Sequence, residues 1–208
     1  MTMRASRISM WFTVGCAVLL FLPVAAHAQN WYTGITYEMS FPTGDLQNFV
    51  DETSFRGFGM TFRQVVDKNL TTGLFFGWNV FHKRTTETSQ LNNGAITGTQ
   101  DRTLNSFPMM LNAHYYLGSR GDIRPYFGLN AGGWIVLQRL AIGIYQLEKD
   151  SFEWGVVPEV GIVIPLSREV ALFANGKYNY AFTGKGLSGD DFNMAYSGVN
   201  VGFAWQQY

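Results

Sequence analysis

The amino-acid sequence predicts an all-β fold, an eight-stranded antiparallel up-and-down transmembrane β-barrel. First, apolar and polar residues alternate with a period of two over segments of about ten residues or slightly more. Second, long and short connections alternate between these segments. Third, no segment after Ala28 is apolar for the ~20 residues that a transmembrane helix needs. Such a chain can cross a membrane only as strands.

The first 28 residues have the pattern of a secretory signal peptide. Arg4 and Arg7 form a basic start, residues 11–26 are an apolar stretch, and Ala26-His27-Ala28 is a cleavage site of the small-x-small type. The stretch is short for ~30 Å of hydrocarbon and no stop-transfer charges follow it, so a retained membrane helix is the weaker interpretation. We expect residues 1–28 to be a cleaved signal peptide and residues 29–208 to form one barrel domain.

The composition of the mature chain limits its partners. The leader holds two arginines and no acidic residue, which leaves a net charge of −2 on residues 29–208, so no nucleic-acid partner is expected. The only cysteine, Cys16, lies in the leader, so the barrel must fold without disulfides. Charged residues make up 14% of the chain, whereas about a quarter is usual in soluble domains. This low charge favours a membrane protein.

The first four strands are expected at residues 31–41, 55–66, 70–80 and 103–117. The first of these strands shows the pattern most clearly, because one face carries Trp31, Thr33, Ile35, Tyr37, Met39 and Phe41. Asp67-Lys68-Asn69 makes a tight turn between the second and third strands. We expect the polar stretch 82–102 to be a long loop.

The last four strands are expected at residues 124–137, 152–165, 170–182 and 194–208. Pro125 lies at the start of its strand, a position where a strand tolerates proline. The strand at 152–165 has two different faces. One carries Trp154, Val156, Val160, Ile162 and Ile164, and the other carries Glu153, Gly155, Glu159 and Gly161. One face of every strand is therefore apolar and the other small or polar.

The connections alternate in length. Long connections are expected at residues 42–54, 82–102, 138–151 and 183–193, and short ones at 67–69, 118–123 and 166–169. Outer-membrane barrels have short periplasmic turns and longer extracellular loops. We therefore expect a bacterial outer-membrane location with both termini in the periplasm.

A soluble eight-stranded barrel such as a lipocalin is the main alternative, and the character of the two faces disfavours it. One face carries large aromatic and aliphatic residues, whereas the other carries glycine, asparagine and isolated charges, which suits a crowded polar lumen better than a surface in water. Aromatic residues at strand ends are expected to form the two interfacial girdles: Trp31, Phe41, Trp78, Trp154, Tyr180 and Trp205.

The candidate site is a polar network in the lumen, formed by Glu38, Arg63, Asn112, His114, Glu159 and Lys177. Glu159 and Lys177 should lie at one height on adjacent strands, about half-way through the wall, and are expected to pair because a lone buried ion costs several kcal/mol. Solvation by lumen water, or a pair between Glu159 and Arg63, are the alternatives.

No catalytic, cofactor or metal site is predicted. His82 and His114 lie on different strands without convergent ligands, so a hydrogen-bonded filler role for His114 and an interfacial role for His82 are preferred. Ser106 and His114 are about 26 Å apart along one strand at ~3.3 Å per residue, too far for a catalytic dyad. A pair of His82 with a serine such as Ser89 stays open.

Three features of the sequence resemble the small outer-membrane β-barrel proteins related to the OmpA transmembrane domain. They are Ser40-Phe41-Pro42-Thr43-Gly44-Asp45-Leu46, Arg124-Pro125-Tyr126-Phe127-Gly128-Leu129-Asn130-Ala131-Gly132, and a terminal aromatic residue. The resemblance covers the mature chain and implies recognition by the barrel-assembly machinery. Tyr208 is out of step with Phe203 and Trp205, so a bulge near Gln206 and Gln207 or a frayed end is expected.

The resemblance also implies a role in envelope integrity, adhesion or binding of an external ligand. The expected protein is therefore a monomeric, non-enzymatic outer-membrane barrel that contacts membrane lipids and lipopolysaccharide and acts through its extracellular loops. A small-solute or hydrophobic-molecule channel is the alternative, although eight strands leave an interior that side chains just fill. A lipid A-modifying barrel enzyme is the third class.

Overall fold

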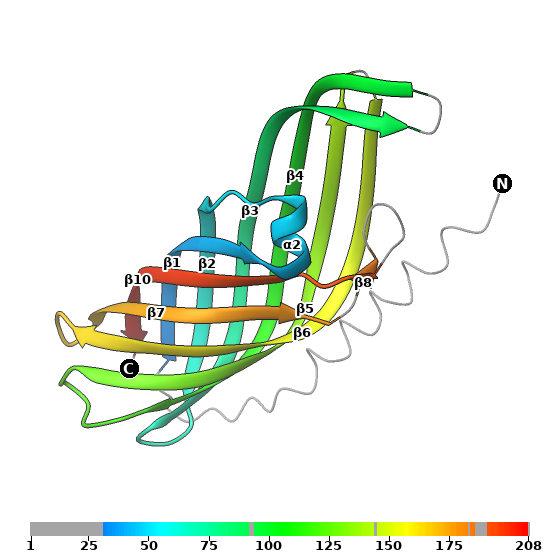
Figure 1. Cartoon of the computed structure of the whole chain (residues 1–208). Coiled ribbons are helices and arrows are strands. Elements are labelled where there is room, and N and C mark those ends of the chain that lie inside the picture. The colour runs from blue at the N-terminus through cyan, green and yellow to red at the C-terminus, as the bar shows by residue number, and fades with distance from the viewer. Residues whose placement is uncertain (1–30, 92–93, 144, 183, 186–190, 208) are drawn as a thin grey trace.

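The computed structural model describes residues 31–91, 94–143, 145–182, 184–185 and 191–207, so the predicted signal peptide lies outside the described residues. Eight antiparallel strands close into a barrel in the order β1-β10-β7-β6-β5-β4-β3-β2 (Figure 1). They are β1 (Trp31–Thr43), β2 (Ser54–Val65), β3 (Leu70–Leu91), β4 (Gly94–Tyr116), β5 (Arg124–Ile142), β6 (Tyr145–Pro165), β7 (Val170–Ala181) and β10 (Ala195–Gln207). The predicted fold class is confirmed.

Two smaller elements lie in the connections. The helix α2 (Gly44–Phe49) follows β1, and the pair β8 (Gly184–Lys185) and β9 (Asp191–Phe192) forms a two-stranded sheet between β7 and β10. Gly44 begins the helix with a φ of +59°, a left-handed conformation that favours glycine. In the part of the chain that the structure describes, no helix has the length and apolarity to cross a membrane.

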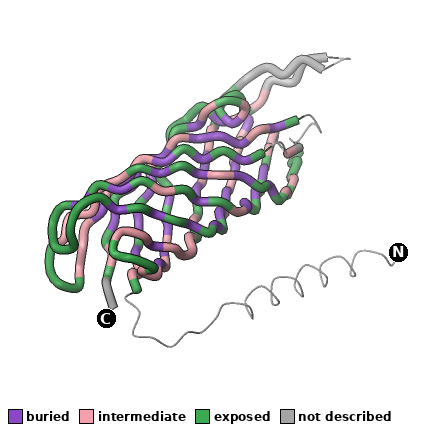
Figure 2. Tube along the Cα trace, turned by 90° about the horizontal axis from the view of Figure 1, so that it is seen from below, coloured by how far each residue is buried: buried purple, intermediate pink, exposed green. Residues whose placement is uncertain are grey.

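Alternating burial along the strands confirms the predicted faces. Buried and exposed positions follow one another along the tube in Figure 2, as the pleat of a strand requires. All six girdle candidates are exposed to the outside, from Tyr180 at 38% to Trp154 at 61%. Trp78 stacks on Phe107 of the next strand with ring centroids 6.1 Å apart. The barrel therefore carries an apolar outer belt around a polar lumen.

Two of the predicted long loops are wrong. The described strand residues of these stretches, 82–91 and 94–102 in the first and 138–142 and 145–151 in the second, are paired: the β3–β4 ladder runs on to Leu91 and Gly94, and the β5–β6 ladder to Ile142 and Tyr145. The polar composition suggested a loop, but strands outside a bilayer need no apolar face, and β-branched threonines favour extended backbone. The ends of β3, β4, β5 and β6 therefore extend beyond the rest of the barrel as one sheet. This extension is called here the loop-end sheet, and it rises at the top of Figure 1.

The ladders contain one irregularity. Pairing between β1 and β2 shifts between Glu38 and Ser40, where Glu38 opposes Gly57 and Ser40 opposes Ser54, so β2 holds an extra residue. The C-terminal strand shows no such shift, because β10 pairs regularly with β1 from Ala195 through Gln207. The bulge expected near Gln206 and Gln207 is therefore absent, and Tyr208 lies outside the described residues.

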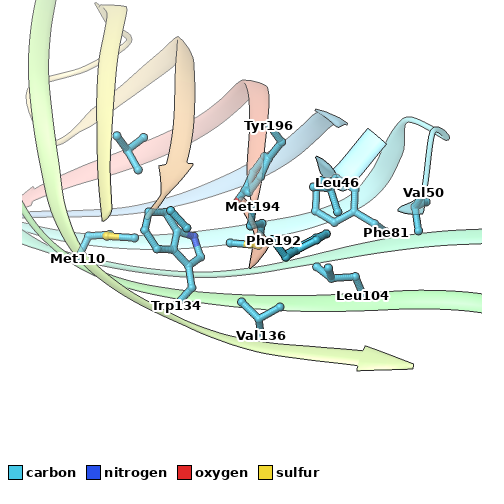
Figure 3. Packing of buried hydrophobic residues seen from close by; sticks show 12 residues of the cluster. Leu46, Val50, Phe81, Leu104, Met110, Trp134, Val136, Phe192, Met194 and Tyr196 are labelled. Atoms are coloured by element: carbon cyan, nitrogen blue, oxygen red, sulfur yellow. The ribbon is translucent and has the colours of Figure 1, made fainter. Parts of the chain in front are cut away.

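An apolar cluster, called here the plug, fills the lumen toward the loop end (Figure 3). Trp134, Phe81 and Tyr196 point inward from three strands and are fully buried, and Phe81 packs edge-on against Tyr196 at 5.2 Å. The connections supply four further members, because Leu46 and Val50 come from the α2 segment and Phe192 and Met194 from the segment before β10. The remaining members are Leu104, Met110, Val136, Val157 and Ala181.

Polar contacts tie the α2 segment over the plug. Asp45 accepts a hydrogen bond from the backbone N–H of Asn193, and the Lys83 ammonium lies 2.9 Å from the Asp51 carboxylate. The hydrogen bond from Lys83 lowers the pKa of the Asp51 carboxyl below its ordinary value. The first and last long connections are thus held together above the lumen.

A charge on the outer belt should destabilise the barrel. Leu129 is 52% exposed on the outer face of β5, so Leu129→Arg is expected to lower the free energy of unfolding by about 2 to 4 kcal/mol if the site lies near the bilayer midplane. Urea unfolding in lipid vesicles measures this change. Leu147→Arg, at a leucine of 57% exposure on the loop-end sheet, is the control and should have little effect. Equal costs at the two sites would contradict the assignment of the belt.

Candidate functional site

The six polar residues predicted for the lumen are all buried on the inner face of the barrel. None of these six residues exceeds the 7% exposure of Lys177, and Glu38 and His114 are at 0%. They come from β1, β2, β4, β6 and β7, which the closure of the barrel brings around one interior. Their contacts form two clusters, one around each carboxylate.

The first cluster surrounds Glu159 of β6. Its carboxylate accepts hydrogen bonds from the Tyr126 hydroxyl at 2.7 Å and from the Asn130 amide at 3.2 Å. The Arg63 guanidinium lies 3.6 Å from one oxygen and His114 Nε2 lies 3.4 Å from the other. Several donors therefore replace the water that this buried carboxylate loses.

Arg63 and Tyr126 extend this cluster across the lumen. Arg63 donates to Thr61 and to the Tyr116 hydroxyl, each at 3.0 Å, while the Tyr126 hydroxyl accepts from Asn175 at 3.1 Å. Asn200 then donates to Asn175 at 2.6 Å. The cluster thus links six of the eight barrel strands: β2, β4, β5, β6, β7 and β10.

The second cluster surrounds Glu38 of β1. The Lys177 ammonium lies 2.6 Å from one carboxylate oxygen, and the Asn79 amide donates to the other at 3.0 Å. Ser40 in turn donates to Asn79 at 2.9 Å. The Lys177 ammonium also lies 4.4 Å from the centre of the Phe75 ring, a distance suited to a cation–π contact.

The predicted pair of Glu159 and Lys177 does not form, although the two residues do lie directly opposite each other on β6 and β7. The Lys177 side chain instead reaches Glu38 of β1, on the far side of β10. Its register partner on β10 is Gly198. A Cβ on Gly198 would lie 3.2 Å from the Lys177 side chain, so the absence of a side chain there opens the path to Glu38. Glu159 pairs with Arg63 instead, which was the alternative.

Other residues of the two clusters were not predicted as site residues. Tyr126, Asn79 and Asn175 lie at inward-facing positions. The alternation of inward and outward residues along each strand is therefore the sequence signal that could have identified them. His114 packs edge-on against Tyr126 at 5.4 Å, and a Cβ on the facing Gly128 would overlap the His114 ring. Asn112 is buried as expected, but neither atom of its amide group has a hydrogen-bond partner.

The arrangement favours charge neutralisation over chemistry. Of the described residues, no group of three or more His, Cys, Asp or Glu side chains could hold a metal. Ser106 lies deep at the plug end of β4, and His114 belongs to the Glu159 cluster. His82 Nδ1 lies 3.2 Å from both Thr103 Oγ1 and Asp101 Oδ1, and the Ser89 side chain lies outside the described residues.

Double-mutant cycles should identify the partner of Lys177. Lys177→Met is expected to destabilise the barrel by about 3 to 5 kcal/mol, because it leaves the Glu38 carboxylate buried without its cation. Adding Glu38→Gln should recover part of this loss, measured by urea unfolding in vesicles. The matched cycle of Lys177→Met with Glu159→Gln should show a smaller coupling energy than the cycle with Glu38→Gln. A larger coupling energy with Glu159→Gln would identify Glu159 as the partner of Lys177.

Comparisons with known proteins agree with this architecture. No protein family model matches the sequence, and no curated protein matches it either. Among solved structures, Neisserial surface protein A superposes with a TM-score of 0.55 at 13% identity, covering 86% of this chain and 97% of that one. Ail, the attachment invasion locus protein of Yersinia pestis, solved with the heparin analogue sucrose octasulfate, gives 0.53 at 11%, covering 87% and 100%.

A major outer membrane protein from Thermus thermophilus gives a TM-score of 0.52 at 13% identity, covering 87% of this chain and 100% of that one. Identities this low establish the fold alone. These matches agree with the fold implied by the sequence resemblance and with the closed ladder of eight strands described above. This chain has the fold of the eight-stranded outer-membrane β-barrel proteins.

Proposed function

We propose that the protein is a non-enzymatic integral outer-membrane barrel that carries out a structural, adhesion or ligand-binding role through its loop end. The closed lumen carries this proposal. Two charge clusters occupy the middle of the barrel, and the plug fills the lumen toward the loop end. Among the residues that the structure describes, side chains thus occupy the lumen in its middle and toward the loop end, so the loop end offers its outer surface for function.

The outer belt supports the membrane location. Large apolar side chains are exposed on every barrel strand, including Ile35, Phe58, Phe76, Leu111, Leu129, Val160, Tyr178 and Phe203. An exposed apolar surface of this extent is unstable in water and is the surface that lipid tails cover. Outer-membrane lipids and lipopolysaccharide are thus the proposed surroundings, with insertion by the barrel-assembly machinery.

The asymmetry of the two ends supports the orientation. At one end, called here the turn end, three short turns lie beside the first residue of β1 and the last residues of β10 (Figure 1). The loop-end sheet extends from the other end. Short turns in the periplasm and long hairpins outside the cell are the usual arrangement of such barrels, which supports a periplasmic location for both termini.

The loop-end sheet is the proposed binding surface. Its exposed residues combine apolar side chains, such as Tyr145 and Leu147, with charges of both signs, such as Arg139 and Glu148, which lie 3.6 Å apart. Of these residues, Tyr145 and Arg139 are of types that are enriched at protein interfaces. A channel is the second candidate, but the plug blocks the lumen toward the loop end.

Cysteine labelling on whole cells should establish the orientation. The mature chain has no cysteine, so Thr86→Cys on the loop-end sheet and Ser119→Cys at the turn end provide matched single thiols at exposed positions. A membrane-impermeant maleimide is expected to label only the first in intact cells, and both in lysed cells. Labelling of Ser119→Cys alone in intact cells would reverse the orientation.

Shortening the loop-end sheet should remove binding but leave the barrel intact. Arg84 and Asp101 are register partners, so an Asn-Gly turn in place of residues 85–100 preserves the pairing below. We expect bacteria that display this variant to lose adhesion to immobilised matrix proteins or heparin, the latter chosen because a heparin analogue was solved with Ail. The boiled and unboiled protein should still differ in gel mobility.

Planar bilayers separate this role from that of a channel. The intact protein should give no steady conductance because the plug closes the lumen. A variant with Leu46, Phe192 and Met194 all changed to serine loosens the plug, and it is the positive control for detection of a pore. Steady conductance of the unmodified protein would favour the channel.

A further inference from the structure

The turn end holds a cavity that the proposed binding surface does not involve. It has a volume of about 550 Å³ and lies between the turn after β4 and the turn after β6, with Arg120, Asp122, Arg168 and Glu169 at its rim. A narrower pocket of about 50 Å³ continues from it toward the lumen. The two share Tyr32, Arg120, Arg124, Val163, Ala171 and Ala204, so they form one funnel.

The narrow part of this funnel is strongly cationic. Its lining includes Arg63, Lys68, Arg120 and Arg124, against a single carboxylate, that of Asp67. The Asp67 carboxylate accepts a hydrogen bond from the backbone N–H of Lys68 at 2.7 Å, within their own turn. Arg63 shares its charge with Glu159 at 3.6 Å, so Lys68, Arg120 and Arg124 carry most of the uncompensated charge.

Arg124 is the residue that points to a ligand. The residue is only 8% exposed, and its guanidinium carbon lies over the Tyr116 ring at 4.6 Å from the ring centre. One terminal nitrogen donates to the backbone carbonyl of Lys68 at 3.4 Å, but the shielded Nε has no hydrogen-bond partner. Buried polar groups are normally paired, so a buried guanidinium that lines the pocket and has an unused donor is suited to an anion.

We propose that the turn-end funnel binds a ligand through an oxyanion group, a phosphate or a carboxylate, held by Arg124 with Arg120 and Lys68. Guanidinium groups match the geometry of such oxyanions, and a pocket of about 50 Å³ accommodates one group of this size. The wider mouth, lined in part by Pro165, Leu166 and Val170, accommodates the rest of the ligand. The anionic group can belong to a lipid headgroup or to a soluble molecule.

Calorimetric titration of the refolded mature protein in non-ionic detergent tests this proposal. Pyrophosphate and citrate are the probes, at ionic strength held constant with NaCl. The intact protein should bind at least one of them saturably, and Arg124→Gln should weaken this binding by about tenfold, the loss expected for a charge-assisted hydrogen bond. Arg139→Gln, an exposed arginine at the loop end paired with Glu148, is the matched control and should leave binding unchanged.

Two results would overturn the proposal. One is the absence of saturable binding of both probes, and the other is equal weakening by Arg124→Gln and Arg139→Gln, which indicates attraction to net charge alone. If Arg124→Gln does not show the gel-mobility difference of a folded barrel, Arg120→Gln, at an exposed turn position, replaces it with the same expectation.

A second set of titrations distinguishes the source of the anion. In vesicles of phosphatidylcholine alone, a soluble ligand should bind as in detergent. If a lipid headgroup occupies the funnel, added phosphatidylglycerol should compete and weaken pyrophosphate binding, and this competition should disappear in Arg124→Gln. Either outcome retains the oxyanion site and identifies its natural occupant by class.

Discussion

The buried carboxylates of Glu38 and Glu159 impose the constraint on which the interior depends. A charge in a narrow lumen must be neutralised there, because neither lipid nor bulk water reaches it. Glu159 obtains its partners from β2, β4 and β5, and Glu38 obtains its own from β3 and β7. The contacts of Arg63 and His114 with Glu159, and of Lys177 and Asn79 with Glu38, join strands that share no ladder, so they fix the cross-section of the barrel in a way that backbone pairing alone does not.

At the loop end, the plug covers apolar side chains that would otherwise face water. There the inward side chains are apolar, and an apolar lumen open to water would be costly. The α2 segment and the segment before β10 cover it with Leu46, Val50, Phe192 and Met194. Connections that are far apart in the sequence thus become part of the core.

Much of the fold could be predicted from the sequence because one physical rule acts on every membrane-spanning strand. Lipid on one side and a crowded lumen on the other enforce a period of two, as in the run from Trp31 to Phe41. This alternation is required only of residues inside the bilayer. The extensions of β3 to β6 are polar, so their composition predicts loops where the structure has strands. Residue parity placed Glu38, Arg63 and Lys177 inside, but it could not assign their partners. Those depend on which small residue, here Gly198, leaves a path between strands.

The ladder between β1 and β10 has a consequence for the order of folding. It pairs Trp31 with Gln207, so the two ends of the barrel domain lie in neighbouring strands. Contacts between such distant residues form slowly, because the entropy lost in closing the intervening chain must be recovered by the last strand to arrive. The ring of hydrogen bonds cannot close before β10 is present. Loss of either β1 or β10 should therefore prevent closure of the barrel rather than weaken it.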